Sequence, residues 1–576
     1  MIDKQLILQR ANEWTKEPFD EEIRRAVRRL IEEDTDELIE SFYKDLEFGT
    51  GGMRGIMGVG TNRMNKYTIG KNTQGLANYL KAQFPGKDLS VAVNYDVRHN
   101  SKEFARLVAD VLSANGIKVY LFKEFRLTPE LSFAVRYLKT DAGIVLTASH
   151  NPPEYNGYKV YWNDGAQVVP PHDKGIVEAI KKVDFKDIKF NADESLIEYV
   201  GEELDNAFIK AAIAHATFGA KKRDNIRILF TSLHGTSITI MPRAMKEAGF
   251  TDFHIVEEQA EPNGDFPTVK SPNPEEPAAF EMALKKADEI QADMILATDP
   301  DADRIAVAVR DLNGKMVLLN GNQTMAVMDQ YLIEKEKQYK RLTGKEFIAS
   351  TIVSTDLIMD IGKQNNVIVK RSLTGFKWIA KLIRDYEGKL RFIGGGEESF
   401  GYMVGDFVRD KDSITSGLLA AEIASEMKHK NSSFFEYLLD IYRQNKLYKE
   451  HLVALVKKGL EGKAEIDEMM VRFRNNPPEE IDGEKVVRIE DYLKSQIRDT
   501  QTGHTRPIEE IPSSNVLIYY TENNTKVALR PSGTEPKIKF YISVNTDLNT
   551  YGEFEEKDRQ LTAKINRIVK ELGIDG

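Results

Sequence analysis

One pattern of strands and helices occurs three times along the chain, between residues 89 and 401. In each copy a short β-rich run leads into a helix, then a second strand, then a third strand that ends in a polar loop. The copies span residues 89–152, 225–304 and 346–401, and their closing loops read TASHNP, DPDADR and GGGEESFG. Three similar domains explain such a repeat more simply than chance does.

The near-continuous apolar strands of the repeat indicate sheets buried on both faces, with helices covering them. Residues 1–45 have the pattern of helices that cover the surface of the first copy. Because ligands bind beyond the carboxyl ends of strands in α/β sheets, we expect the three loops to face one central cleft. The sequence therefore predicts an α/β protein: three similar α/β domains with mixed sheets, plus a smaller C-terminal α+β domain.

The C-terminal part departs from the repeat. Residues 450–515 are polar and helix-like, whereas residues 514–544 read as three strands, with a turn at Asn523-Asn524 between the first two. A closing helix is expected over residues 553–572. The predicted domains are residues 1–205, 206–320, 321–450 and 451–576.

Charge and composition argue against several classes of protein. Lys and Arg number 80 against 90 Asp and Glu, a net charge of −10, whereas a nucleic-acid binder usually carries a basic excess or stripe. Cysteine is absent, which excludes disulfides, thiolate metal sites and Cys nucleophiles. No apolar run approaches the roughly 18 residues of a membrane span, and the N-terminus has no signal-peptide core. We therefore expect a soluble cytoplasmic protein with no nucleic-acid or membrane partner.

The loop DPDADR places Asp299, Asp301 and Asp303 between two apolar runs. Carboxylates two residues apart in an extended segment point the same way and repel each other unless a cation joins them. Hard divalent cations such as Mg²⁺ take oxygen ligands, so the loop predicts a metal site. An EF-hand does not fit, because Arg304 stands where that loop needs Gly and Arg310 where it needs Glu. The remaining alternative is a solvated acidic turn.

The segment TASHNPPEYNGYK, residues 147–159, follows a buried strand and places Ser149 at the strand tip. A Ser–His–Asp hydrolase is disfavoured, because G-x-S-x-G is missing and adjacent Ser149 and His150 should point in different directions. A phosphorylated Ser149 would need a metal and cations nearby, which the aspartate loop and Arg304 can supply. His150 and Lys159 are candidates for proton transfer. Alternatively, Ser149 only caps a turn before two prolines.

Three further loops offer groups that bind phosphate or sugar. The Gly-rich stretch at 48–58 carries Arg54 and can bring backbone N–H groups to a phosphate. The loop at 394–401 offers two carboxylates and a hydroxyl to sugar hydroxyls, and Lys377 lies just upstream. The loop at 530–537 combines two cations with a turn that can cradle phosphate, through Arg530, Ser532, Gly533, Thr534 and Lys537. Each loop also has an ordinary interpretation, as a flexible loop, an acidic turn or a basic hairpin turn.

Together these motifs resemble those of the α-D-phosphohexomutase family, the phosphoglucomutases and phosphomannomutases. Four motifs occur in family order over almost the whole chain: TASHNP, DPDADR, GEES and RPSGTEP. The family fold, four domains around one cleft, matches the three copies and the different fourth part. FGTGGMRGIMGVGTNRMN (48–65) resembles a longer subgroup that includes phosphopentomutases.

The resemblance implies a role for each motif. Ser149 is expected to carry a phosphoryl group, and its oxygen is expected to bind Mg²⁺ together with Asp299, Asp301 and Asp303. The expected sugar contacts are Glu397 and Ser399, and the expected binders of the phosphate that is not transferred are Arg530, Ser532, Gly533 and Thr534. The expected charge and proton-transfer set around the two phosphates is His150, Lys159, Arg54, Arg304 and Lys377. Phe400, Gly401 and Tyr402 follow GEES where some members have His, so no proton-transfer role is carried over there.

The implied activity is the reversible conversion of glucose 1-phosphate and glucose 6-phosphate, through a phosphoserine enzyme and a glucose 1,6-bisphosphate intermediate. Phosphomannomutase, phosphopentomutase and glucose 1,6-bisphosphate synthase are alternatives within the class. A metal-dependent sugar phosphatase, which releases inorganic phosphate, and a non-catalytic phosphosugar-binding protein are alternatives from other classes. In the mutase scheme either Lys159 or His150 accepts the proton of the attacking hydroxyl.

Overall fold

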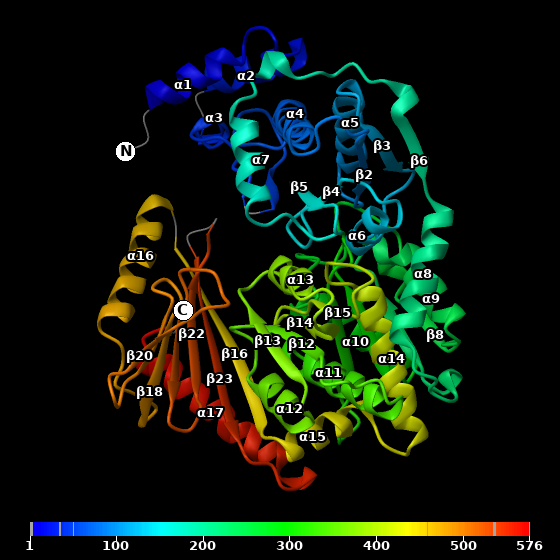
Figure 1. Cartoon of the computed structure of the whole chain (residues 1–576), viewed down its shortest axis with the longest axis vertical. Coiled ribbons are helices and arrows are strands. Elements are labelled where there is room, and N and C mark those ends of the chain that lie inside the picture. Colours follow the sequence, from blue (N-terminus) through cyan, green and yellow to red (C-terminus); the bar gives the residue numbers. More distant parts are fainter. Residues whose placement is uncertain (1–3, 34–35, 50, 458, 534–536, 575–576) are drawn as a thin grey trace.

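The chain forms four sheets in sequence order, each with its own helices (Figure 1). The computed structural model describes residues 4–33, 36–49, 51–457, 459–533 and 537–574. As predicted, the N-terminal segment is helical and covers the first unit, through α1 (Lys4–Glu13), α2 (Glu21–Glu33) and α3 (Asp36–Phe42). The predicted class, three α/β units with mixed sheets and a different C-terminal unit, is confirmed.

The first sheet has six strands and is mixed. In spatial order its strands are β1 (Gly52–Ile56), β5 (Tyr155–Trp162), β4 (Ala142–Leu146), β2 (Ser90–Tyr95), β3 (Lys118–Phe122) and β6 (Ile197–Val200). Its helices are α4 (Lys66–Gln83), α5 (Ser101–Ala114), α6 (Thr128–Tyr137), α7 (His172–Lys181) and α8 (Glu202–Ala216).

The second and third sheets repeat the centre of the first. The second runs β11 (Met316–Leu318), β10 (Ile305–Arg310), β9 (Met294–Thr298), β7 (Ile228–Thr231) and β8 (Phe253–Ile255), with helices α9 (Met241–Glu247) and α10 (Glu281–Glu289). The third runs β13 (Ile368–Ser372), β12 (Glu346–Thr351), β14 (Arg391–Gly396) and β15 (Tyr402–Val404). Its helices are α11 (Gly321–Gln338), α12 (Leu357–Asn365), α13 (Phe376–Asp385), α14 (Ser413–His429) and α15 (Phe434–Gln444).

The three copies share one topology that fixes where their polar loops lie. Each has three parallel strands, β4-β2-β3, β9-β7-β8 and β14-β12-β13. The last strand of each trio along the chain, β4, β9 or β14, is followed by an antiparallel neighbour, β5, β10 or β15. Strands β4, β9 and β12 are buried along their whole length, as expected for sheets covered on both faces. The motifs TASHNP, DPDADR and GEES therefore all lie in the connection between the last strand of a trio, β4, β9 or β14, and its antiparallel neighbour.

Helix starts are specified locally by polar side chains. Capping boxes begin three helices, because a side chain at the N-cap and one three residues on each satisfy the other's free backbone N–H. The pairs are Asn65 with Thr68 at α4, Asn320 with Gln323 at α11, and Ser433 with Glu436 at α15.

The fourth unit is an antiparallel sheet, and here one prediction is wrong. Residues 450–515 were expected to be helix-like, but among the described residues of this stretch only α16 (Gly459–Asn475) is an α-helix. The sheet runs β16 (Leu447–Val456), β23 (Lys537–Thr546), β22 (Lys526–Pro531), β21 (Leu517–Thr521), β18 (Glu484–Asp491), β19 (Gln496–Asp499) and β20 (Thr505–Pro507), with β17 (Glu480–Ile481) beside β18. The three predicted strands are β21, β22 and β23, the turn at Asn523-Asn524 joins the first two, and α17 (Phe554–Glu571) is the predicted closing helix.

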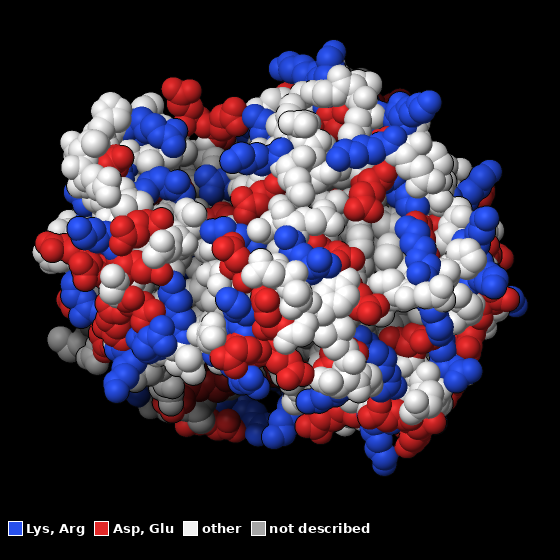
Figure 2. Space-filling view, turned by 90° about the horizontal axis from the view of Figure 1, so that it is seen from below, with Lys and Arg blue, Asp and Glu red and all other residues white. Residues whose placement is uncertain are grey.

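Buried apolar side chains join the units. One cluster contains Phe230 of β7, Phe347 of β12 and Phe540 of β23, so the second, third and fourth units share a core. On the face drawn in Figure 2, Lys and Arg are interspersed with Asp and Glu. Among the described residues, no helix is both long and apolar enough to cross a membrane. The cytoplasmic location stays a prediction.

Candidate active site

The loops of the first and second units meet at Ser149. Its hydroxyl lies 2.7 Å from Oδ2 of Asp299, to which it donates a hydrogen bond. Both residues are buried, Ser149 to 3% exposure and Asp299 fully. The structure thus brings together the predicted phosphoryl carrier and a predicted metal ligand, although they are 150 positions apart in the sequence.

The backbone at Ser149 is in the left-handed region, with φ of 52°. A non-Gly residue rarely adopts this conformation, and such strain clusters at functional sites. The expectation that Ser149 and His150 point apart is wrong, because it assumed an extended chain; Nδ1 of His150 lies 3.2 Å from the Ser149 hydroxyl. A hydrolase triad still does not form, since Asp299 receives the serine hydroxyl directly rather than holding the imidazole.

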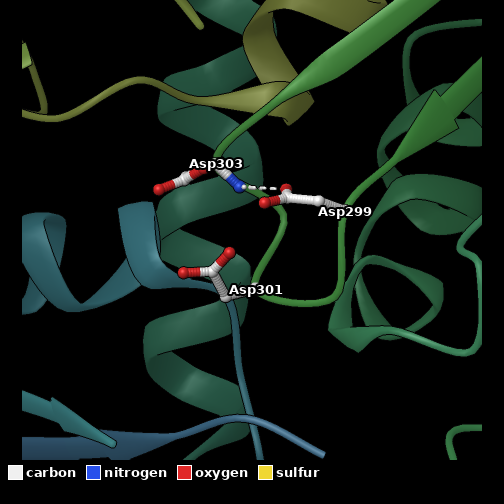
Figure 3. Close-up of side chains that lie close together, drawn as sticks. All are labelled: Asp299, Asp301 and Asp303. Carbon is white, nitrogen blue, oxygen red and sulfur yellow. Dashed lines mark hydrogen bonds between the residues drawn. The ribbon is translucent and has the colours of Figure 1, made fainter. Parts of the chain in front are cut away.

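The three aspartates converge on one point (Figure 3). Each offers a carboxylate oxygen within 4.8 Å of those of the other two, and all three side chains are buried. The arrangement is a turn rather than the expected extended segment: Ala302 has φ of 57°, and its N–H donates to the Asp299 carbonyl. Oδ1 of Asp299 then accepts the N–H groups of Asp303 and Arg304, at 3.1 and 3.0 Å.

Two lysines, of which Lys411 is buried and Lys159 is partly exposed, neutralise part of this charge. Lys159 of β5 lies 2.8 Å from Oδ2 of Asp301, and Lys411 lies 2.6 Å from Oδ2 of Asp303. Burial and its two acidic neighbours raise the pKa of Asp299 well above its usual value. Burial acts the same way on Asp301, but Lys159 overcomes it and holds the pKa of Asp301 well below its usual value. The Asp299 carboxyl therefore ionises less readily than an ordinary aspartate unless a cation binds beside it.

The donor set fits a hard divalent cation. Oδ1 of Asp301 and Oδ1 of Asp303 are buried and have no hydrogen-bond partner within the described part of the chain. Buried carboxylate oxygens are rarely left unpartnered, because each costs free energy of desolvation. Three carboxylates with oxygens to spare, next to a serine hydroxyl, are the kind of oxygen ligand that Mg²⁺ takes.

The predicted cations surround this point. Arg54 of β1 donates to Oδ1 of Asn151 in the serine loop, at 2.8 Å. Arg304 is paired with Glu275. Burial, Arg304 and Arg54 all lower the pKa of His150 well below its usual value. The pKa of Lys159 is raised instead, because Asp301 and Asp303 outweigh its burial. His150 is thus uncharged and Lys159 charged at neutral pH.

The loop of the third unit lies beside the metal loop. Its Phe400 carbonyl accepts the N–H of Ile305, the residue after Arg304, at 3.0 Å. Glu397 is buried and accepts the Gly375 N–H at 2.7 Å, which joins the GEES loop to the segment that carries Lys377. Burial and the adjacent Glu398 raise the pKa of Glu397 to about 7. Ser399 is half-buried in the turn between β14 and β15.

The phosphate-loop candidates lie at the end of β22 and the start of β23. Arg530 stands opposite Lys539 across the two strands, an arrangement that repels unless an anion lies between them. The Ser532 N–H donates to the Lys537 carbonyl at 2.7 Å, and Gly533 is the residue after Ser532. Thr534 lies outside the described residues. Nη1 of Arg530 lies 3.4 Å from the hydroxyl of Tyr541. Burial and the negative charge of Glu398 raise the pKa of Tyr541.

Four residues near the site were missed from the sequence. Thr128 donates to Asp301 at 2.9 Å, Lys411 pairs with Asp303, Lys539 faces Arg530, and Arg98 holds the serine loop. Arg98 and Lys411 stand in the charged stretches DVRHN and RDKDS, which have the composition of solvated surface. Of the four, only Lys539 could have been identified from the sequence, because it is a basic residue two positions after Lys537 on the same strand.

Comparison with known proteins gives a consistent result. The chain matches phosphoglucomutase/phosphomannomutase alpha/beta/alpha domain I over residues 45–187, domain II over 206–314 and domain III over 320–442. It is 38% identical to a phosphoglucomutase of Staphylococcus aureus strain MRSA252 over 575 residues, which is 98% of each chain. It is 39% identical to that of strain MSSA476 over 94% of this chain and 96% of the other.

Two solved structures share the fold. A putative phosphomannomutase from Thermus thermophilus superposes with a TM-score of 0.66 at 22% identity, over 92% of this chain and 99% of that one. The open form of the Paramecium phosphoglucomutase parafusin superposes with a TM-score of 0.67 at 17% identity, over 92% and 96% of the two chains. At these identities the likeness concerns the fold.

Proposed function

The chain belongs to the phosphoglucomutase/phosphomannomutase family, and on that basis we propose that it is a phosphoglucomutase. It interconverts glucose 1-phosphate and glucose 6-phosphate through a phosphoserine enzyme. The observation that carries the proposal is the buried contact between the Ser149 hydroxyl and Asp299, inside a cluster of three carboxylates and two lysines. The proposed domains are residues 1–205, 206–320, 321–450 and 451–576.

Ser149 carries the phosphoryl group in the resting enzyme and passes it to O6 of glucose 1-phosphate, which gives glucose 1,6-bisphosphate. The intermediate then reverses its orientation in the site. Its 1-phosphate is transferred to Ser149, and the product is glucose 6-phosphate. Phosphoryl transfer needs positioning and charge stabilisation more than covalent help. Lys159, which pairs with Asp301, and Arg304, whose backbone N–H donates to Asp299, supply fixed positive charge at the metal loop. Arg54 holds Asn151 in the serine loop.

The residues that would hold Mg²⁺ are Asp299, Asp301, Asp303 and the oxygen of Ser149. When bound there, Mg²⁺ supplies neutralisation of the charge on the transferring group. The unpartnered Oδ1 atoms of Asp301 and Asp303 support this assignment.

Of the two candidate proton acceptors, His150 fits the site better. Its imidazole is uncharged and lies 3.2 Å from the Ser149 hydroxyl, so a nitrogen is available to take the proton of the attacking sugar hydroxyl. Lys159 keeps its proton because two aspartates face it. We assign Lys159 the role of a fixed cation.

The remaining loops bind the parts of the substrate that do not react. Glu397 and Ser399 contact the sugar hydroxyls, and Lys377 lies near one phosphate. The phosphate that is not transferred has its own binding site, which we call the handle. It is formed by Arg530, Ser532, Gly533, Thr534 and Lys537. A handle and a set of hydroxyl contacts that tolerate reversal let the sugar bind in both orientations.

The test of this function is a kinetic panel of glucose, mannose and pentose 1-phosphates with Mg²⁺ and catalytic glucose 1,6-bisphosphate. We expect the highest kcat/KM with glucose 1-phosphate and no release of inorganic phosphate. Preference for a mannose or pentose phosphate would reassign the substrate. Stoichiometric release of phosphate without isomerised product would identify a sugar phosphatase instead.

Replacing Arg530 should mainly weaken substrate binding. In Arg530→Ala we expect KM for glucose 1-phosphate to rise about 10- to 100-fold, the loss of one or two charge-assisted hydrogen bonds. Because the handle acts on ground state and transition state alike, kcat should change much less. Steady-state kinetics measure both. Arg506→Ala, an exposed arginine on β20 of the same unit, is the matched control; an unchanged KM in Arg530→Ala would count against the handle.

The alkaline side of the pH profile should report Lys377. Burial lowers the pKa of Lys377 to about 8, so its positive charge is present below pH 8 and is lost above it. If Lys377 binds a phosphate, kcat/KM should fall above about pH 8, since this ratio reports groups of the free enzyme.

The conservative variant decides the assignment. In Lys377→Arg the fall should move to higher pH, because a guanidinium stays charged throughout. Lys381→Arg, on the same helix and salt-bridged to Asp385, should leave the profile as in the wild type. The same alkaline limb in Lys377→Arg and wild type would rule out Lys377 as its source.

A further inference from the structure

The serine loop is held by one buried arginine outside the motif. Arg98 follows β2 and donates from Nη2 to the carbonyls of Ser149, at 2.5 Å, and Asn151. Its Nη1 donates to the carbonyls of Pro152 and Tyr155, at 2.8 and 3.1 Å. We infer that Arg98 is a positioning residue, which sets the backbone of the serine loop so that the Ser149 hydroxyl faces the metal loop.

The Arg98 side chain is in turn held by Asp96. Its Nε lies 3.3 Å from Oδ2 of Asp96, and neither side chain is exposed. Asp96 also accepts the hydroxyl of Ser101 at 2.8 Å and the Arg98 N–H at 2.9 Å. Nε and Oδ2 form a buried ion pair without a hydrogen bond, and this pair holds the charged end of Arg98 beside Asp96. Because a guanidinium is planar and presents its donors in a rigid fork, its two terminal nitrogens face the loop together.

The second unit closes over the same guanidinium. The ring of Phe266 lies 5.1 Å from Cζ of Arg98 and is buried. At Gly264 a Cβ would come within 2.9 Å of the His99 nitrogen, so the two backbones are in close contact there. Nε2 of His99 lies 2.7 Å from Asp265. Arg98 therefore lies where the unit with the serine loop meets the unit with the metal loop.

This placement has a consequence for the chemistry. Ser149 is in a left-handed conformation that is costly for a residue with a side chain, and it persists only where the surroundings fix it. Four hydrogen bonds from one side chain to four carbonyls of this loop provide that constraint. An error of about 1 Å in the position of a reacting group can cost about 100-fold in rate. Arg98 therefore governs transfer of the phosphoryl group without touching it.

The inference rests on the proposed mutase function and is tested with three proteins. Arg98→Met combined with Asp96→Asn removes the fork and leaves no buried unpaired charge. Arg98→Lys keeps the charge beside Asp96 but loses the fork. The control is Arg223→Met combined with Glu422→Gln, an ion pair in which Glu422 is buried and Arg223 partly exposed. Arg223 likewise donates to a carbonyl, that of Ala248, and lies over the ring of Phe250, away from the serine loop.

The measurements are kcat and KM for glucose 1-phosphate, and the single-turnover rate of transfer from labelled Ser149. We expect the Arg98/Asp96 variant to lose about 100-fold in kcat and in the transfer rate with KM within about twofold. Arg98→Lys should recover about tenfold of that loss, because an ammonium can still donate to part of the loop. The control should retain the wild-type transfer rate.

Each outcome decides the question. If the double variant does not fold, as judged by circular dichroism, Arg98→Lys carries the test through its fall in kcat at constant KM. Wild-type transfer rates in Arg98→Lys, or a loss confined to KM, would overturn the inference. A wild-type protein that takes up label on Ser149 without isomerising sugar would overturn the proposed function, and the uptake rates would still decide the role of Arg98.

Discussion

Ser149→Ala is expected to lower mutase turnover by at least about 10⁴-fold, because loss of a nucleophile that forms the covalent intermediate removes the pathway itself. Ser149 is the one hydroxyl that touches Asp299 among the described contacts, and it is buried against the metal loop. No water-mediated route replaces it, since water would yield inorganic phosphate and not an isomer.

Label exchange separates this explanation from a general loss of structure. Incubation with labelled glucose 1,6-bisphosphate should phosphorylate the wild type once per chain and should leave Ser149→Ala unlabelled, as read by intact mass. Ser195→Ala, which removes an exposed hydroxyl of the same unit, should label and turn over normally. Labelled Ser149→Ala protein, or turnover within tenfold of the wild type, would place the phosphoryl carrier elsewhere.

The repeated part of the fold was predictable because its central strands are buried and carry short apolar runs. In β4, β9 and β12 every residue is buried, and the runs AGIVL, MILA and FIA mark the three strands. The fourth unit gave no such signal between residues 480 and 507. There β19 and β20 are largely exposed, and their sequences QIRD and TRP are as polar as a helix surface. β19 is a strand because it pairs with β18, and β20 is a strand because it pairs with β19. A local sequence pattern does not show such pairing.

The site was predictable where one loop carried all its chemistry. The three aspartates stand in one hexapeptide, so it could be predicted that their carboxylates converge. The turn that brings them together could not be predicted. Arg98 and Lys411 could not be identified, because each is defined by partners from other parts of the chain. Lys411 meets Asp303 from 108 positions away, and Arg98 meets the Ser149 carbonyl from 51 positions away. The geometry of His150 was predicted wrongly because one positive φ at Ser149 reverses the direction of its neighbour.

Asp301→Asn should lower activity by roughly 10³-fold, since a cation bound by two carboxylates instead of three loses several kcal/mol of charge stabilisation. Asp301 offers an unpartnered Oδ1, while its Oδ2 already accepts Lys159 and Thr128. The amide keeps the shape of the side chain and can still accept from Thr128. The change therefore acts on the charge of the site more than on its packing.

Metal binding gives a readout that does not depend on turnover. A ligand that binds only the folded state at 100 times its Kd adds about 2.7 kcal/mol of stability, so Mg²⁺ should raise the Tm of the wild type. In Asp301→Asn the same Mg²⁺ concentration should raise Tm far less. The fall in affinity should also appear as a higher Mg²⁺ concentration for half-maximal activity. Asp288→Asn, an exposed carboxylate on α10 of the same unit, should match the wild type in both measurements.

The change in Tm that Asp301→Asn causes in the absence of metal distinguishes a metal site from an ion-pair network. Three carboxylates within 4.8 Å repel one another, and burial and its two neighbours already raise the pKa of Asp299. Removing the charge of Asp301 relieves that repulsion but weakens the hold on Lys159, whose next partner, Asp303, lies 3.6 Å away. These two changes oppose each other, so Tm in a chelator should shift little. A large loss of Tm in chelator, with Mg²⁺ titration as in the wild type, would mean that the aspartates serve the lysines and not a cation.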